Sequence, residues 1–121
     1  MAWAKFDDSF YDHPKVMQVL ATEPMALVLF IRATTYCARH LTDGKLRPNV
    51  IEALVPLQRD RESQVKSLID AGLLYDHEGF FWVHDYQDYN PTKEQVEEKK
   101  AEDKERKRKA AAAKKAKEDR G

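Results

Sequence analysis

Residues 61–84 read RESQVKSLIDAGLLYDHEGFFWVH, and the spacing of their apolar residues changes halfway through. The first half has apolar residues at helical spacing, namely Val65, Leu68 and Ile69. Gly72 follows where a left-handed C-cap would end a helix. The second half is rich in aromatic and β-branched residues on both sides of a His-Glu-Gly turn, which is typical of a β-hairpin. The stretch predicts a helix over 61–71, a turn over 77–79, and strands over 73–76 and 80–84.

The residues before this stretch add three helices and one short extended segment. Helical spacing of apolar residues predicts helices over about 14–22, 24–41 and 49–55, and residues 45–47 form an extended piece between the last two. Asn49 is predicted to cap the third helix and Asp60 the helix over 61–71. At the N-terminus we expect four aromatic residues to dock an extended or turn-like segment on the core: Trp3, Phe6, Phe10 and Tyr11.

This order of elements predicts a mainly α fold with a small β-hairpin. Two helices, a short strand, two further helices and a hairpin are the order of a winged helix-turn-helix domain, a DNA-binding type in which the hairpin is the wing. Nearly all large apolar residues lie before residue 92, so the domain is predicted over 1–91. Residues 92–121 are predicted to form a charged, basic helical tail.

The tail carries the clearest electrostatic feature of the chain. The whole chain has a formal net charge of zero, but 12 basic and 8 acidic residues give residues 92–121 a charge of +4, and 9 basic and 13 acidic residues give residues 1–91 a charge of −4. Thr92 and Gln95 have the spacing of a capping box at the start of a helix. Acidic and basic residues four apart predict stabilising pairs along this helix: Glu102 with Arg106, Asp103 with Lys107, and Glu105 with Lys109.

The helix over 61–71 is the candidate recognition helix of the predicted domain. Its predicted outer side carries Ser63, Gln64 and Ser67, which would contact base edges in the major groove. Phosphate contacts are predicted for Arg59, Arg61 and Lys66. The tail would add affinity that does not depend on base sequence, through Arg106, Lys107, Arg108, Lys109, Lys114, Lys115 and Lys117.

Other readings of the same residues remain open. A solvated helix face and a solubilising tail would carry the same residues, and Asp76 and Glu78 place negative charge on the predicted wing, where phosphate would be repelled. The alternative function is therefore a protein-interaction adaptor that uses the acidic wing. A set of aromatic residues forms either a base-stacking platform or anchors of the hairpin and linker: Trp3, Trp82, Tyr86 and Tyr89.

Composition argues against several other classes of protein. One cysteine excludes an intramolecular disulfide, and Cys37 with His40 lacks the partners of a metal site, so we expect a buried thiol and a surface histidine. The histidines are scattered, without a nearby nucleophile, and no phosphate-binding glycine loop occurs, so neither an enzyme nor a cofactor is expected. The chain shows neither a signal peptide nor an apolar run long enough to span a membrane, and a cytoplasmic protein is expected.

Several stretches, taken in order, resemble the N-terminal domain of phage replisome organisers and DnaD-like replication initiators. They are 12–16 (DHPKV), 43–46 (DGKL), 68–74 (LIDAGLL), 79–86 (GFFWVHDY) and 89–91 (YNP), together with Trp3, Phe6, Ala33 and Tyr36 and the charged helical run that follows. The resemblance covers about residues 3–110. It implies a winged-helix fold, binding of double-stranded DNA at or near a replication origin, and self-assembly or contacts with replication proteins. Related initiators often continue into a second domain, whereas a basic tail follows here, so a role in regulation is a further expectation.

Overall fold

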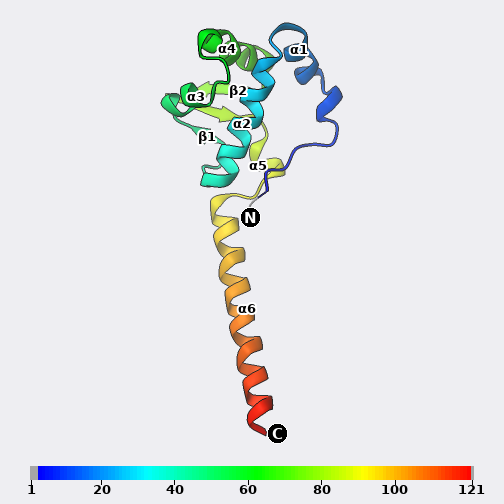
Figure 1. The fold of residues 1–121 in the computed structure, drawn as a ribbon, viewed down its shortest axis with the longest axis vertical. Coiled ribbons are helices and arrows are strands. Elements are labelled where there is room, and N and C mark those ends of the chain that lie inside the picture. Colours follow the sequence, from blue (N-terminus) through cyan, green and yellow to red (C-terminus); the bar gives the residue numbers. More distant parts are fainter. Residues whose placement is uncertain (1–2, 121) are drawn as a thin grey trace. The chain divides into compact units, whose positions relative to one another are not determined.

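The computed structural model describes residues 3–120, apart from the side chains of Tyr89 and of residues 118–120. The chain forms two compact units that divide between Asn90 and Pro91. The first unit contains η1 (Phe10–Asp12), α1 (Pro14–Thr22), α2 (Met25–His40), β1 (Lys45–Leu46), α3 (Pro48–Leu54), η2 (Gln58–Asp60), α4 (Arg61–Ala71), β2 (Leu74–His77), β3 (Phe80–Val83) and α5 (Tyr86–Tyr89). The second unit is the single helix α6 (Lys93–Arg120), drawn from yellow to red in Figure 1.

The helices begin and end near the residues that the sequence pattern predicts. Pro14 stands at the start of α1, where its missing N–H costs nothing, and the ring Nδ1 of His13 accepts from the backbone N–H of Lys15 at 3.2 Å. Gly72 ends α4 in the left-handed conformation, with φ of 79°. The backbone N–H groups of Gly72 and Leu73 then donate to the last turn of α4.

Of the two predicted N-caps, Asn49 is wrong, and Asp60 occupies the N-cap position without a side-chain capping bond. Helix α3 begins at Pro48, so its N-cap is Arg47 and not Asn49, and no side chain caps it. A proline at the first helical position already lacks one of the N–H groups that a cap would satisfy. Asp60 does precede α4, but its carboxylate makes no capping hydrogen bond and lies 3.6 Å from Nε of Arg59.

A three-stranded antiparallel sheet in the order β1-β3-β2 packs against the helices. Strand β3 is central, because Trp82 pairs with Lys45 of β1 on one side and with Tyr75 of β2 on the other. The hairpin strands differ from the prediction by one residue at three of their ends: β2 begins at Leu74 and includes His77, which pairs with Phe80, and β3 ends at Val83. The turn is therefore the two residues Glu78 and Gly79, with φ of 53° and 79°. Two positive φ angles define the type I′ turn, whose twist matches that of the strands.

The core lies between α2, α4, α3 and the sheet, with α2 running through the middle of the unit (Figure 1). Its largest fully buried apolar side chains include Leu29, Leu46, Ile51, Leu68 and Leu74. Leu46 and Leu74 pair across the sheet with Phe81 and Val83 of β3, so that one face of the sheet is apolar and covered. The opposite face carries the alternate residues of the strands.

The N-terminal segment docks through two of its four aromatic residues. Phe10 stacks on Phe30 of α2 with ring centroids 5.8 Å apart, and Phe6 meets both rings edge to face. The side-chain amide of Asn90 holds the segment as well, because it accepts from the N–H of Lys5 at 2.7 Å and donates to its carbonyl at 3.2 Å. Trp3 and Tyr11 are each 76% exposed, so their predicted docking is wrong.

Helix α6 begins with the predicted capping box. The backbone N–H of Thr92 donates to Oε1 of Gln95 at 2.9 Å, and the N–H of Gln95 donates back to Oγ1 of Thr92 at 3.2 Å. Val96 is the only large apolar residue in this unit, so packing contributes little to its stability.

The ion pairs of α6 are not the predicted ones. Arg106 pairs with Asp103 at 2.6 Å and Arg108 with Glu105 at 2.8 Å, three residues apart instead of four. Residues three apart are also neighbours on a helix surface, and the forked guanidinium of arginine reaches the carboxylate in the preceding turn. These two arginines therefore replace Lys107 and Lys109 as the partners of Asp103 and Glu105.

Candidate nucleic-acid interface

Two of the predicted phosphate contacts lie on one groove of the first unit. Arg61 and Lys66 are both exposed and line a groove of about 380 Å³ between α3, α4 and the hairpin. Three carboxylates line the same groove, those of Glu52, Glu62 and Asp76. The cations are therefore outnumbered where the sequence predicts a phosphate site. Within about one Debye length, carboxylates offset much of the attraction that two cations exert on DNA.

Gln64 does not lie on the outer side of α4, so its predicted contact with bases is wrong. Its side chain is fully buried, and its Nε2 donates to the carbonyl of Leu57 at 3.1 Å. Its Oε1 is buried without a hydrogen-bond partner. The buried side of α4 consists of Gln64, Leu68 and Ala71, whereas Val65 and Ile69 are only half-buried. The helix is thus rotated relative to the predicted orientation.

The other predicted residues near α4 are partly engaged by acids. The hydroxyl of Ser63 donates to Oε2 of Glu23 in the loop after α1, at 2.6 Å. Arg59 is 83% exposed and forms an ion pair with its neighbour Asp60. Ser67 is half-buried. Among the residues predicted to contact base edges, only the two serines retain access to solvent.

The tip of the hairpin is acidic, as expected from the sequence. Asp76 and Glu78 are exposed, and Nε2 of His77 lies 3.6 Å from Oε1 of Glu78. Both residues of the turn, Glu78 and Gly79, are exposed. A phosphate group would meet two carboxylates there.

The predicted cations of α6 differ in what surrounds them. Arg106 and Arg108 are each paired with an acid, as described above. Lys107, Lys109, Lys114, Lys115 and Lys117 are exposed. Residues 106–117 carry seven basic residues and no acidic one, whereas residues 93–105 carry four basic and six acidic residues. The basic half of α6 is thus the strongest concentration of positive charge in the sequence.

The three aromatic candidates whose side chains the structure describes do not share one exposed surface. Trp3 is exposed, Trp82 is half-buried on the sheet, and Tyr86 is 5% exposed against the core. The side chain of Tyr89 lies outside the described residues. Burial raises the pKa of Tyr86 to about 12, so its hydroxyl stays neutral and the residue acts as an anchor of the first unit.

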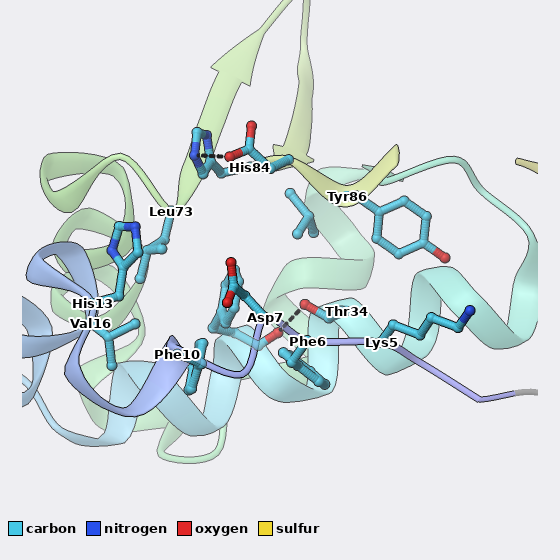
Figure 2. A pocket seen from close by; sticks show the side chains of 13 residues that line it. Lys5, Phe6, Asp7, Phe10, His13, Val16, Thr34, Leu73, His84 and Tyr86 are labelled. Atoms are coloured by element: carbon cyan, nitrogen blue, oxygen red, sulfur yellow. Dashed lines mark hydrogen bonds and ion pairs between the residues drawn. The ribbon is translucent and has the colours of Figure 1, made fainter. Parts of the chain in front are cut away.

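The structure places one of the histidines that are scattered along the sequence, His84, in a cluster of polar side chains. Nε2 of His84 lies 2.6 Å from Oδ2 of Asp85 and 3.0 Å from Nζ of Lys15, and its Nδ1 contacts the hydroxyl of Tyr75. His84 and Asp85 line a cavity of about 70 Å³ together with His13. Figure 2 shows the side chains of His84 and His13 at this cavity. Phe6, Phe10 and Leu73 make much of this cavity apolar (Figure 2).

The cluster joins three elements that are far apart in the sequence. Lys15 at the start of α1 also lies 3.4 Å from the carbonyl of Gly72 after α4, so it connects α1 to the end of α4 and to the base of the hairpin. Alternation along β3 could have placed His84 on the same face as Trp82, but no local pattern indicates that Lys15 would meet it. We assign the cluster a structural role.

A pH dependence of stability follows from this cluster. Burial lowers the pKa of His84; the carboxylates of Asp85 and Asp88 oppose this effect, and the electrostatic influence of Lys15 and His13 adds to it, so that the pKa is lowered overall. The unfolded chain therefore takes up a proton more readily, and stability is lost as pH falls below the ordinary histidine pKa of about 6.5. Urea unfolding at two pH values, above and below this pKa, should show a larger loss for the native chain than for His84→Gln. An equal loss in both proteins would contradict the assignment.

Metal binding finds no support among the described residues. They contain no group of three or more His, Cys, Asp or Glu side chains close enough to hold an ion. Cys37 is fully buried, and burial raises the pKa of its thiol. The ring of His40 is exposed and packs on Tyr36, with centroids 4.3 Å apart. The predicted buried thiol and surface histidine are thus confirmed.

Comparisons with family models, with curated proteins and with solved structures gave no match for this chain. Within residues 3–120, no helix is both long and apolar enough to cross a bilayer. The functional argument therefore depends on the geometry and the charges described above.

Proposed function

We propose that this chain is a winged-helix protein that binds double-stranded DNA and serves phage replication initiation or its regulation. The observation that carries the proposal is the arrangement of α2, α3 and α4 around a three-stranded sheet of order β1-β3-β2, whose last two strands form a hairpin. In a winged helix, the element in the position of α4 enters the major groove. The resemblance to replisome organisers points to the same class of fold and to the replication role.

In the proposed complex, α4 positions the domain and α6 supplies most of the affinity. The exposed residues of α4 include two cations, Arg61 and Lys66, and two acids, Glu62 and Asp70. A helix surface with balanced charge gives little net attraction to phosphate. The lysines of the basic half of α6 add electrostatic affinity that is the same for every DNA sequence. With Gln64 buried, base recognition is limited to Ser63 and Ser67, so we expect weak sequence preference.

Fluorescence anisotropy of a labelled duplex of about 20 base pairs tests the proposal. At about 50 mM salt the full chain should bind with a dissociation constant below about 100 µM, the weak end of ordinary non-specific affinity. The affinity should fall steeply as salt is added. Binding weaker than this limit would reject the proposed function.

A second candidate function is a protein-interaction adaptor, and a separate observation favours it. The wing is acidic, and α1 and α2 expose Met17, Leu20, Val28 and Ile31. Exposed apolar residues rimmed by polar ones are typical of protein contacts. A stoichiometric partner captured from nuclease-treated host lysate, and retained by Arg61→Ala and Lys66→Ala, would favour the adaptor. The partner would be a replication or host protein or a second copy of this chain.

A further inference from the structure

A second groove in the first unit carries a net positive charge, whereas the groove beside α4 does not. It has a volume of about 410 Å³ and lies between the end of α2, β1, the start of α3 and the first residue of β3. We call it the β1 groove. Lys45, Arg47 and Asn49 line it and are exposed, and the half-buried rings of Tyr36 and Phe80 line it too. Among the described residues that line it there is neither Asp nor Glu.

The sheet register places one of these cations over aromatic rings. Lys45 pairs with Trp82 across the sheet, and side chains on β3 alternate, so Phe80 and Trp82 lie on the same face as Lys45. Nζ of Lys45 is 3.9 Å from the ring centroid of Phe80 and 5.7 Å from that of Trp82. Attraction between an ammonium group and the face of a ring holds the charge beside the groove.

Cations beside half-buried aromatic rings are typical of sites that bind single-stranded nucleic acid. Proteins that bind single-stranded nucleic acid use cations along the phosphate backbone and aromatic side chains on which unpaired bases stack. The bases of a duplex are already stacked on each other, so they are not free to stack on aromatic side chains in a groove. The groove beside α4 has a similar volume, about 380 Å³, but its three carboxylates would repel a phosphate.

We propose that the β1 groove binds single-stranded nucleic acid, with phosphates against Lys45 and Arg47 and a base against the rings of Tyr36 and Phe80. The side-chain amide of Asn49 can donate to and accept from the edge of that base. This activity goes beyond the proposed binding of duplex DNA and uses different residues. The chain would then hold a duplex and an unpaired strand at separate places.

The test compares a thymidine dodecamer with an abasic oligonucleotide of the same length, both labelled, on the full chain. The cations of α6 attract both probes equally, because they contact only phosphate. The β1 groove should add a preference for the probe that has bases, of about fivefold or more. A uridine dodecamer is run beside them, and a preference over its abasic form shows whether RNA is a ligand as well as DNA.

Three variants locate the preference. Phe80→Leu keeps an apolar side chain but removes the ring, and the double change Lys45→Gln with Arg47→Gln removes the cations. Phe80→Leu should reduce the preference to near one, because it removes a ring on which the base stacks. The double change should weaken binding of both probes and lower the salt slope for the thymidine probe by about 1.4. The matched control is Arg61→Gln with Lys66→Gln, which removes two charges from the other groove and should keep the preference.

Two outcomes would overturn the proposal. One is equal affinity of the native chain for the base-containing and abasic probes, and the other is a preference that survives Phe80→Leu. Duplex binding is measured on the same samples. If the native chain does not bind the duplex but prefers the base-containing probe to the abasic one, the proposed function is rejected and the assignment of the β1 groove stands. Near-ultraviolet circular dichroism of each variant confirms that the first unit is folded.

Discussion

Replacing Lys109, Lys114 and Lys117 together with Gln is expected to weaken binding of duplex DNA by on the order of a hundredfold at about 0.1 M salt. These lysines are exposed and lie in the half of α6 that has no acidic residue. Each phosphate contact that is lost should reduce the slope of log affinity against log salt by about 0.9, so the slope should change by about 2.7. Fluorescence anisotropy at several salt concentrations measures both quantities.

The acidic half of the same helix supplies a matched control. Lys99, Lys100 and Lys104 are also exposed, but six carboxylates lie among residues 93–105. Changing these three lysines to Gln removes the same charge with the same chemistry and should alter the salt slope by less than about one unit. If both triple variants lose equal affinity, the position of the charge does not matter, and α6 acts only through its net charge.

Gly44→Ala is expected to destabilise the first unit by roughly 2–5 kcal/mol. Gly44 is buried between α2 and β1 with φ of 89°, and its carbonyl accepts from the N–H of Val83 at 2.9 Å. An added Cβ would lie 2.9 Å from Cβ of Tyr86, which is itself packed in the core. The left-handed conformation costs an L-residue about 1–2 kcal/mol, and overpacking costs about 1–3 kcal/mol more.

Gly79→Ala separates the two contributions. Gly79 has φ of 79°, similar to Gly44, but an added Cβ would meet nothing within 4 Å. Only the conformational cost of about 1–2 kcal/mol applies there. Thermal unfolding followed by near-ultraviolet circular dichroism reports on the first unit alone, since residues 92–121 contain no aromatic side chain. Each kcal/mol lowers the melting temperature by about 4–8 °C for a unit of this size. Equal losses at Gly44 and Gly79 would show that Tyr86 does not crowd Gly44.

Local signals in the sequence account for most of the secondary structure. Pro14, Gly72 and the pair Thr92 and Gln95 mark helix ends through interactions within a few residues, and these ends agree with the structure. The run of aromatic and β-branched residues over 80–84 likewise predicts a strand, and β3 spans Phe80–Val83. Such signals act over one or two turns of chain, so they can be read without the tertiary fold.

The rotation of α4 could not be predicted from the sequence. Periodicity favours Val65 and Ile69 as inward residues, because both are larger and more apolar than their neighbours. In the structure Nε2 of Gln64 donates to the carbonyl of Leu57, seven residues earlier in the chain. A buried amide can be accommodated when such a partner is present, and the spacing of apolar residues does not reveal that partner.

The candidate sites depend on pairings between distant residues. Lys45 meets Phe80 and Trp82 only because β1 pairs with β3 in one register, and Lys15 meets His84 only because α1 packs beside the base of the hairpin. A two-residue β1 gives almost no pattern from which its register could be deduced. The sequence thus indicates the types of residue available, and the fold determines which of them share a surface.

Amide chemical shifts recorded while a duplex is added to the ¹⁵N-labelled chain test the winged-helix proposal most directly. We predict shifts at the solvent-accessible residues of α4 between Arg61 and Ser67 and in residues 106–117 of α6, while Glu78 and Gly79 at the acidic wing tip stay unchanged. Shifts confined to α6 would contradict the proposal, because they would show that the folded unit does not contact DNA.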